Sequence, residues 1–447
     1  MSDEQPMAKG VVEKIGSSDA ILTYKPKDKN AIREIREILN HEIAVNIVLS
    51  MLLHPQHGVI KDKNEIEGVG HRVVHGGEEF SGSVLITNEV IAAMEKCIQF
   101  APLHNPHNLK GIEATGALLP NLSQVGVFDT AFHHTIPPKA YIYGLPYALY
   151  KKLGIRRYGF HGTSHKYVAN KAAEYLEKPI EELRLITCHL GNGASITAVD
   201  GGKSVDTSMG FTPLEGLVMG TRCGDIDPAL VPYIMKREKL TAEEVDNIMN
   251  KNSGMLGLTE TSNDMREIEA EANRGSEQHK LALEVYCHRI KKYIGGYYAL
   301  LGGADAIIFT GGIGENSSFV RSLCLENMDE LGIEIDLQKN DKNDISIGLK
   351  ETAVLVIPTN EELAIARDTC TILSSMKTTE SEKSLVESIG VNGHFSNEEK
   401  RKLVLLWAQN PGMTVEDISS KLAEMTDKHF STEIVKNTLS HLGLINV

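Results

Sequence analysis

Short apolar runs of strand length recur between about residues 66 and 376, and most are followed by a segment with a helical pattern. This alternation predicts an α/β fold built from layers of strands and helices. The expected strands cover residues 66–74, 124–128, 183–188, 304–310 and 353–357. Each run ends in glycines or unusual polar residues. Because ligands bind at the C-terminal ends of strands in open α/β sheets, the pattern predicts one shared cleft.

The last part of the chain has a different pattern. Residues 377–383 are charged and rich in Ser and Thr, and we interpret them as a linker. Three helical stretches follow, over residues 397–409, 414–425 and 431–442. We therefore expect a small all-helical appendage over residues 384–447, similar to a helix-turn-helix unit. Residues 377–447 carry a net charge of −2, which favours a protein partner or simple packing over DNA.

Charge and composition exclude several classes of function. The formal net charge of −14 argues against a general binder of nucleic acid or anionic membranes. No apolar run approaches the roughly 20 residues of a membrane span, and the first residues lack a signal-peptide pattern. The six cysteines form no C-x-x-C pair, which is typical of reduced thiols. The sequence thus predicts a cytoplasmic protein that holds any anionic ligand with local arginines.

Two glycine-rich turns, residues 189–195 and 311–317, follow predicted strands. Their glycines let backbone N–H groups approach an anion, and a helix N-terminus after the second turn favours phosphate. A tight structural turn remains the alternative for either motif alone. The chain has neither G-x-x-x-x-G-K-[ST] nor G-x-G-x-x-G after a strand, so a P-loop or a dinucleotide fold is not supported.

Two arginines, Arg72 and Arg222, lie in apolar or glycine-rich segments, where a charge is costly unless it is paired. A carboxylate or phosphoryl group matches the guanidinium fork. The alternative is a structural ion pair, for example with Asp225, Asp227 or another acid.

Acidic and imidazole groups lie in loops of the same kind: Asp129, His104, His161 and Glu361. In-line phosphoryl transfer requires Arg and His donors and a carboxylate-bound Mg²⁺, because negative charge spreads over the transferring group. A single histidine is more often structural, but several share the predicted cleft.

These residues belong to longer segments that resemble, in order along the chain, the signatures of the acetate kinase family. The segments cover residues 71–77, 101–106, 127–133, 155–165, 189–195, 203–222, 311–317 and 358–363. The resemblance spans about residues 7–376. It implies two α/β domains of the actin, Hsp70 and sugar kinase type flanking a cleft, usually as a homodimer. We place them at residues 1–130 and 131–376, with a possible return to the first domain near residues 360–376.

The resemblance also implies an activity and a set of site residues. The reaction is reversible transfer of phosphate between ATP and acetate, giving acetyl phosphate and ADP, with Mg²⁺ or Mn²⁺. Asp129, His161 and Arg222 match catalytic positions, and Glu361 matches the metal ligand. The acetate site matches Arg72, Val74, Leu103, Phe160 and Pro213. The ATP site matches His189, Leu190, Gly191, Asn192, Gly193, Asp264, Met265, Arg266, Gly312, Ile313, Gly314, Glu315 and Asn316.

Three features depart from the family pattern. The family's opening strand, with its Asn-x-Gly-Ser-Ser-Ser-x-Lys motif, has no counterpart in this sequence, which leads us to expect an exposed sheet edge. Cys223 stands where the family usually has Ser, and Glu260 lies in a stretch that is usually rich in Gly and Ser. A catalytically impaired relative with a regulatory role, and a kinase for propionate or butyrate, are therefore the alternative interpretations. A misassigned start of the chain is a third.

Overall fold

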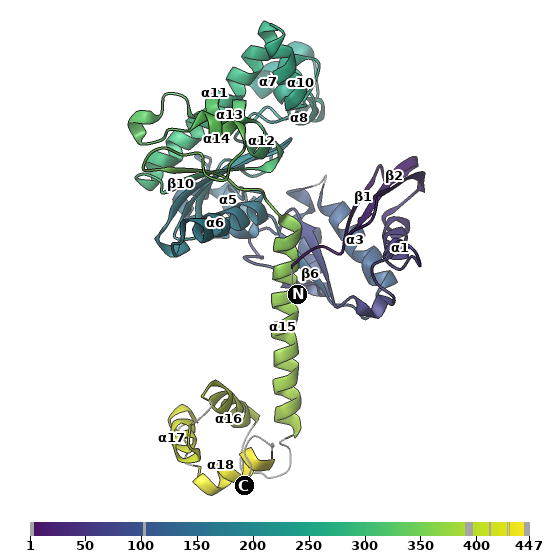
Figure 1. Ribbon diagram of the computed structural model, residues 1–447, viewed down its shortest axis with the longest axis vertical. Helices are drawn as coiled ribbons and strands as arrows, with labels where there is room; N and C mark the ends of the chain where they lie inside the picture. Colours follow the sequence, from purple (N-terminus) through teal and green to yellow (C-terminus); the bar gives the residue numbers. More distant parts are fainter. Residues whose placement is uncertain are drawn as a thin grey trace. The chain divides into compact units, whose positions relative to one another are not determined.

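A computed structural model describes residues 4–101, 104–388, 397–410, 413–426, 428 and 430–441. The chain divides into two compact units, one up to Thr369 and one from Cys370 onward. The first unit contains three sheets and the predicted site (Figure 1).

A five-stranded sheet forms the core of the larger half of the first unit. Its strand order is β11-β10-β7-β8-β9. The strands are β7 (Arg184–Leu190), β8 (Ala194–Asp200), β9 (Lys203–Thr207), β10 (Ala306–Thr310) and β11 (Ala353–Val356). β7, β10 and β11 run parallel, so their C-terminal ends lie at one edge, as the sequence predicts.

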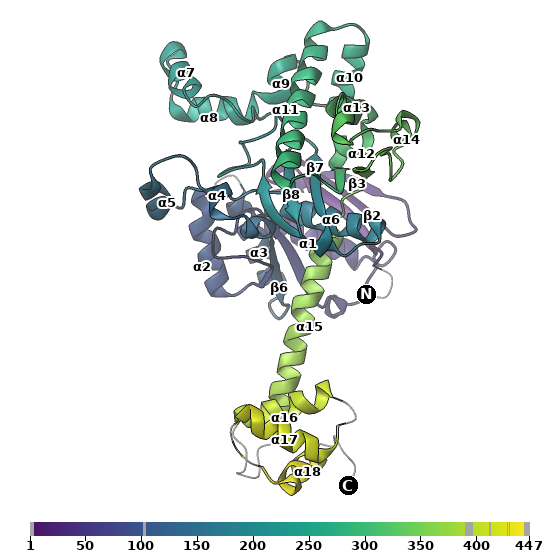
Figure 2. The ribbon, with the colours of Figure 1, turned by 90° about the vertical axis from the view of Figure 1, so that its left-hand side faces the viewer.

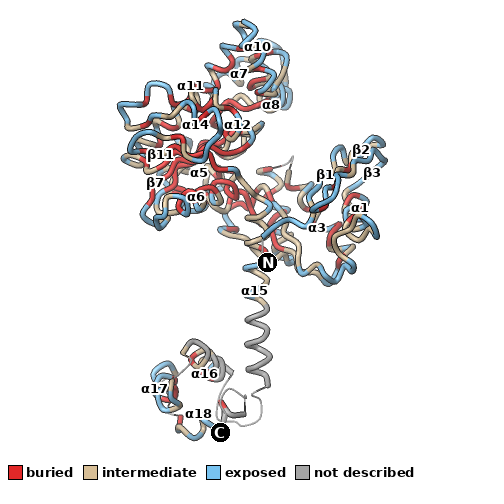
Figure 3. The backbone as a smooth tube through the Cα atoms, in the orientation of Figure 1, coloured by how far each residue is buried: buried red, intermediate tan, exposed pale blue. Residues whose placement is uncertain are grey.

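Two helices cover the opposite faces of this sheet, α6 (Gly162–Leu176) and α11 (Glu277–Leu301) (Figure 2). Alternate residues of β7 point to opposite faces: Ile186 packs in the cluster with α11, and Leu185 in the cluster with α6. All five residues of β10 are buried, because a parallel strand between two helical layers is apolar on both sides. Figure 3 shows this buried core in red around β7 and β11.

The smaller half of the first unit contains two three-stranded sheets. One has the order β4-β6-β5, with β4 (Val69–Val73) parallel to β6 (Gln124–Phe128) and antiparallel pairing of β6 with β5 (Val84–Leu85). The other is the antiparallel meander β1 (Ala8–Glu13), β2 (Ser17–Pro26) and β3 (Ile32–Ile38). Within the described residues β1 and β4 are edge strands of their sheets.

Helices α1 (His41–Leu52), α2 (Asn88–Lys96) and α3 (Asn105–Leu118) accompany these two sheets. Helix α15 (Glu361–Ser388) begins against β4. A Cβ at Gly70 of β4 would lie 2.6 Å from Cγ2 of Ile365, and would also meet the hydroxyl of Thr369. Only glycine permits this approach, which brings the chain back to its N-terminal half near Glu361. The predicted domain boundaries themselves stay predictions.

The remaining helices of the first unit are short. They are α4 (Pro138–Tyr141), α5 (Tyr147–Leu153), α7 (Leu230–Glu238), α8 (Ala242–Lys251), α9 (Gly254–Thr259), α10 (Met265–Asn273), α12 (Gly311–Asn316), α13 (Ser318–Leu325) and α14 (Leu337–Asp341). Single turns of 3₁₀ helix are η1 (Lys63–Glu65), η2 (Cys97–Gln99), η3 (Ala131–Thr135), η4 (Ile180–Glu182) and η5 (Asp329–Leu331).

The second unit contains α16 (Asn397–Gln409), α17 (Val415–Thr426) and α18 (Thr432–His441), within one residue of the three predicted helices. A small core of its own holds them together, formed by Leu403, Leu406, Ile418, Leu422, Phe430, Val435 and Leu439. The predicted linker, residues 377–383, is helical instead, because it lies within α15. No Gly or Pro occurs between residues 361 and 389, so nothing in this stretch breaks the helix.

No helix among the described residues is both long and apolar enough to cross a membrane.

Candidate active site

Ten of the predicted site residues line one cavity of about 210 Å³ in the first unit. They come from the ends of β4 and β6, the start of α3, the loop before α6, the β7–β8 turn and the segment after β9. The cavity is lined by Arg72, Val74, His104, Asp129, Phe160, His161, Asn192, Gly193, Pro213, Thr221 and Arg222. Both halves of the unit therefore contribute, as expected for a cleft at the C-terminal ends of parallel strands. Leu103, also predicted for this site, lies outside the described residues.

Arg72 and Asp129 form a bidentate ion pair across the parallel strands β4 and β6. The Arg72 Nη2 donates to Asp129 Oδ2 at 2.6 Å, and Nε donates to both carboxylate oxygens at 3.1 and 3.2 Å. Asp129 is buried, and burial raises the pKa of its carboxyl although Arg72 opposes the shift. The Arg72 Nε also lies 3.6 Å from Glu361 Oε2, and burial raises the pKa of Glu361 too. Two predicted carboxylates thus face one guanidinium.

Arg222 has no acidic partner among the residues that the structure describes. The recorded contact of its Nη1 is with Met219 Sδ at 3.8 Å, and burial lowers the pKa of the guanidinium. Asp225, proposed from the sequence as a structural partner, instead binds Gly216 N–H, the Tyr293 hydroxyl and Arg289. A largely buried cation without a counter-ion is costly, so the site is prepared for an anion that arrives from solution.

His161 is the N-cap residue of α6 and adopts a left-handed conformation with φ of 58°. The Gly162 N–H donates to the Asp129 carbonyl at 2.9 Å, which ties the His161 loop to the end of β6. The His161 ring stacks on His189, with ring centroids 4.3 Å apart. Burial, reinforced by His189, His165 and both site arginines, lowers the pKa of His161 well below its usual range. The imidazole is therefore uncharged at neutral pH.

The two glycine-rich turns lie side by side, because β7 and β10 are parallel neighbours and Thr310 pairs with His189. A Cβ at Gly311, where φ is 77°, would meet the Leu190 carbonyl at 2.8 Å, so only glycine fits there. Leu190 itself is fully buried in the core. At the predicted ATP site Leu190 can therefore contribute only its backbone. The half-buried Gly191, the exposed Gly312, and Ile313 and Asn316 of α12 lie beside it.

Glu315 has a structural task that the sequence did not reveal. Its Oε1 accepts hydrogen bonds from Gly311 N at 3.0 Å and Thr359 N at 3.1 Å. One carboxylate thereby joins the turn after β10 to the turn before α15, which carries Glu361. Glu315 thus stabilises two turns of the predicted site without lining the cavity itself.

Asp264 and Arg266 lie at the start of α10, next to the turn after β7. Asp264 caps this helix by accepting from the Arg266 N–H, and also forms an ion pair with the Arg266 guanidinium at 2.6 Å. Asn263 Nδ2 donates to Asn192 Oδ1 at 3.0 Å, which connects this segment to the cavity wall. Met265 is buried. Glu260 ends α9 with an exposed side chain, and Cys223 Sγ contacts the Gly224 carbonyl.

Arg321, which is fully buried, holds the Gly314 carbonyl at 2.8 Å and also donates to Asn340 and Asn343. We expect Arg321→Leu to lower the free energy of unfolding by about 3 kcal/mol or more, because the acceptors of a charged donor lose their partner inside the core. Urea unfolding followed by fluorescence and circular dichroism measures this. Arg266→Leu, at an exposed arginine, is the control, and equal midpoints for the two variants would contradict the prediction.

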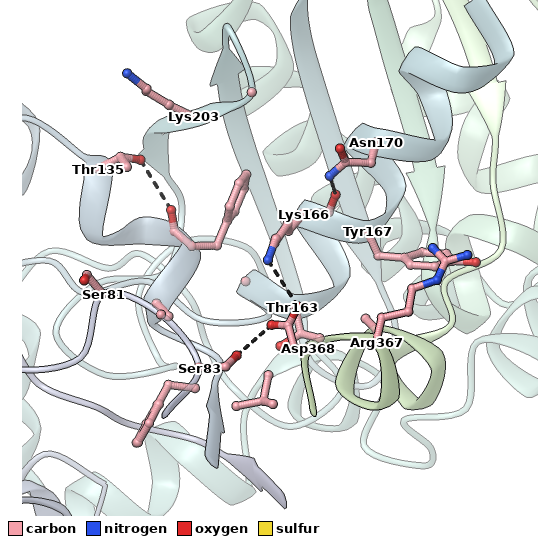
Figure 4. A pocket seen from close by; sticks show the side chains of 18 of the residues that line it. Ser81, Ser83, Thr135, Thr163, Lys166, Tyr167, Asn170, Lys203, Arg367 and Asp368 are labelled. Atoms are coloured by element: carbon pink, nitrogen blue, oxygen red, sulfur yellow. Dashed lines mark hydrogen bonds and ion pairs between the residues drawn. The ribbon is translucent and has the colours of Figure 1, made fainter. Parts of the chain in front are cut away.

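A second cavity, of about 280 Å³, lies between α6, β6 and the start of α15 (Figure 4). Its labelled side chains include Lys166, which pairs with Asp368, and Ser83, which donates to the same carboxylate. Arg72, Asp129, His161 and Arg222 do not line it. The chemistry therefore belongs to the smaller cavity.

That smaller cavity places cationic and neutral donors beside an apolar wall of Val74, Phe160 and Pro213. Guanidinium groups match carboxylates and phosphoryl groups equally well, and the neighbouring glycine-rich turns suit phosphates. The fold and the cavity together define the class: a phosphotransferase of the actin, Hsp70 and sugar kinase type that acts on a small anion.

Comparison with known proteins gives the family. The acetokinase family model matches residues 1–367, and the chain belongs to that family. The acetate kinase of Desulfitobacterium hafniense (strain Y51) is 55% identical over 377 residues, which are 83% of this chain and 94% of that protein. The family match ends just before the second compact unit begins at Cys370.

Two solved structures show the same architecture. The acetate kinase of Porphyromonas gingivalis superposes with a TM-score of 0.79 at 47% identity, over 82% of this chain and 93% of that one. A propionate kinase from Francisella tularensis gives 0.78 at 42% identity, over 82% and 94%. The family consists of phosphotransferases with a carboxyl acceptor, and it uses ATP and a divalent metal.

The residues present fit such a metal. Among the described residues no group of three or more His, Cys, Asp or Glu side chains could hold an ion. Mg²⁺, however, is usually bound by one or two carboxylates together with waters and substrate phosphates. Asp129 and Glu361, which both face Arg72, are two carboxylates of the kind that such a site requires.

The sequence analysis included Ser195 only as part of the glycine-rich turn 189–195, where it could donate to an anion, and it did not single out Thr221. Thr221 lines the cavity, and Ser195 pairs with His189 across the β7–β8 hairpin. The sequence did contain a signal for Ser195, which is the last residue of the first glycine-rich motif. Because this motif forms a hairpin, its last residue lies opposite its first, His189.

Proposed function

We propose that this chain is an acetate kinase, which transfers the γ-phosphoryl group of ATP to acetate and gives acetyl phosphate and ADP, reversibly and with Mg²⁺ or Mn²⁺. The observation that carries the proposal is Arg222, a cation without an acidic partner among the described residues, beside the apolar residues Val74 and Phe160 in a cavity of about 210 Å³. Acetate offers the matching pair of groups, a carboxylate and one methyl.

In the proposed reaction an acetate oxygen attacks the γ-phosphorus while the bond from phosphorus to the ADP oxygen breaks. Acetate is already ionised, so the protein has to orient the anions and stabilise spread negative charge. Arg222 and Arg72 would hold the carboxylate and the phosphoryl group, and His161 would donate a hydrogen bond to the transferring group. Asp129 orients Arg72 through the bidentate pair.

The glycine-rich turns would bind the nucleotide, with residues 189–193, 264–266 and 312–316 around it. Glu361, with Asp129 beside it, would hold the metal ion, which when bound neutralises charge on the phosphates. We further propose that the protein is a cytoplasmic homodimer, as its resemblance to the family implies. We also propose that residues 384–447 bind a protein partner.

Incubation of the purified chain with ATP, Mg²⁺, acetate and hydroxylamine tests the proposal, with acetyl hydroxamate as the product measured. Product formation supports the kinase. Absence of product from a folded chain would instead favour the catalytically impaired relative.

A propionate kinase is the second candidate, because the similar Francisella tularensis structure bears that name. We expect kcat/KM to be higher for acetate than for propionate by about 10- to 200-fold, since one methylene in an apolar pocket is worth that much discrimination. Butyrate should react more slowly still. A higher kcat/KM for propionate than for acetate would instead assign the chain as a propionate kinase.

A further inference from the structure

A chain of hydrogen bonds runs from His161 into the core of the five-stranded sheet. The His161 Nδ1 lies 2.9 Å from Ser195 Oγ, and the same oxygen lies 2.8 Å from His165 Nε2. The His165 Nδ1 lies 2.7 Å from Thr187 Oγ1. Ser195, His165 and Thr187 are fully buried. Each group in the chain must therefore find its hydrogen-bond partner within the protein.

The number of protons in this chain is limited. Burial lowers the pKa of both His161 and His165 well below the usual range, so each imidazole is neutral and carries one N–H. The Ser195 hydroxyl has one proton as well. It can donate to only one of the two rings and must accept from the other, so the protonated nitrogen of His161 depends on His165.

Two arrangements are possible. In the first, Thr187 O–H donates to His165 Nδ1, His165 Nε2–H donates to Ser195, and Ser195 O–H donates to His161 Nδ1. The His161 proton is then on Nε2. In the second, every donation is reversed, and the His161 proton is on Nδ1.

The contacts of Thr187 decide between them. If His165 donates to Thr187, the acceptor that the described residues offer to the Thr187 hydroxyl is the Thr197 carbonyl, at 3.5 Å. In the first arrangement it donates to His165 Nδ1 at 2.7 Å, the other two hydrogen bonds are 2.8 and 2.9 Å long, and the remaining proton, on His161 Nε2, is left for the cavity. A buried donor with a poor acceptor is costly, so the first arrangement is favoured.

The Nε2 of His161 faces the cavity. A Cβ built on Gly193, which lines the cavity, would lie 3.4 Å from this nitrogen and 3.6 Å from Nη1 of Arg222. A proton on Nε2 therefore faces the same part of the cavity as the Arg222 guanidinium.

We propose that Ser195, His165 and Thr187 are positioning residues that fix His161 as a neutral imidazole with its proton on Nε2. His161 then acts as a neutral hydrogen-bond donor to the transferring phosphoryl group rather than as an imidazolium or a proton acceptor. This inference rests on the proposed kinase function.

Nitrogen NMR of the full chain, labelled with ¹⁵N-histidine, reads the tautomer directly. We expect a proton on Nε2 and none on Nδ1 of His161, assigned by the loss of its signals in His161→Gln, with no change between pH 6 and 8. A proton on Nδ1 in the wild-type chain, or a charged ring at pH 7, would overturn the proposal.

Ser195→Ala tests the consequence for catalysis. We expect kcat to fall by about 10- to 100-fold, as for residues that orient a metal-binding side chain through a hydrogen bond. The KM values of this variant for acetate and ATP should stay nearly unchanged. Its His161 signals should show a mixture of both tautomers. Ser208→Ala is the matched control, because Ser208 is an equally buried serine beside β8 that accepts from Ile196 N–H and does not contact His161.

An unchanged kcat in Ser195→Ala, or an equal loss in Ser208→Ala, would contradict the proposal. Failure of the proposed kinase function gives a different result. The wild-type chain would then form no acetyl phosphate, whereas the NMR measurement would still report the tautomer.

Discussion

Arg222→Ala is expected to lower kcat/KM for acetate by about three orders of magnitude, which is the upper range for removing one preorganised donor from a transition state. Arg222 is mostly buried and lacks an acidic partner among the described residues, so its charge is available to the substrate and the transferring group. Acetyl hydroxamate formation at several acetate concentrations measures the effect. Arg222→Lys should recover only part of the activity, because a single ammonium cannot reproduce the guanidinium fork.

The same variant should not destabilise the fold. Removal of one member of a buried ion pair leaves the other charge unpaired. Within the described part of the chain Arg222 has no such partner, and its removal relieves its own desolvation. We expect its urea midpoint to equal or exceed that of the wild type. Arg289→Ala is the control, because Arg289 binds the carbonyls of Gly216 and Asp225 and should lose stability. A kcat/KM for Arg222→Ala within tenfold of wild type would refute the assignment.

Asp129→Asn is expected to reduce kcat/KM by about 10²- to 10⁴-fold, the range for groups that act directly in the transition state. Asn keeps the size of Asp129 but removes the charge that holds Arg72 through the bidentate pair and that would face the metal. Asp305→Asn is a matched control. Asp305 also accepts from an arginine, but it lies at the opposite, N-terminal end of the strands, where it binds Arg184 N–H.

Asp129 also gives a pH dependence. Burial raises the pKa values of Asp129 and Glu361, and a raised carboxyl pKa means that protonation begins at a higher pH than for an ordinary carboxyl group. Activity that needs both charges should be complete above the raised pKa values and should fall as the pH is lowered through them. Glu361→Gln should in addition require more Mg²⁺ for half-maximal rate. If activity fell only at the pH values at which ordinary carboxyl groups become protonated, the result would contradict this prediction.

Much of the fold followed from local patterns. The apolar run at residues 124–128 coincides with β6, and residues 397–409 coincide with α16. Such elements are predictable because the period of apolar residues and the neighbouring glycines are properties of the sequence itself. The segment predicted as a linker, residues 377–383, is helical and lies within α15. Its charged and hydroxyl residues are poor evidence for a break when neither Gly nor Pro interrupts the helix.

The sequence also determined the family, and its motifs at the ends of the expected strands predicted which residues gather in one cavity. The partners of those residues were decided only by the tertiary structure. Arg72 and Asp129 are 57 positions apart, and the parallel register of β4 and β6 makes them a pair, while Arg222 has no acidic partner among the residues that the structure describes. The contact between the start of α6 and β8 likewise places Ser195 between His161 and His165. Contacts between distant strands and loops depend on the packing of the whole sheet, which no local pattern records.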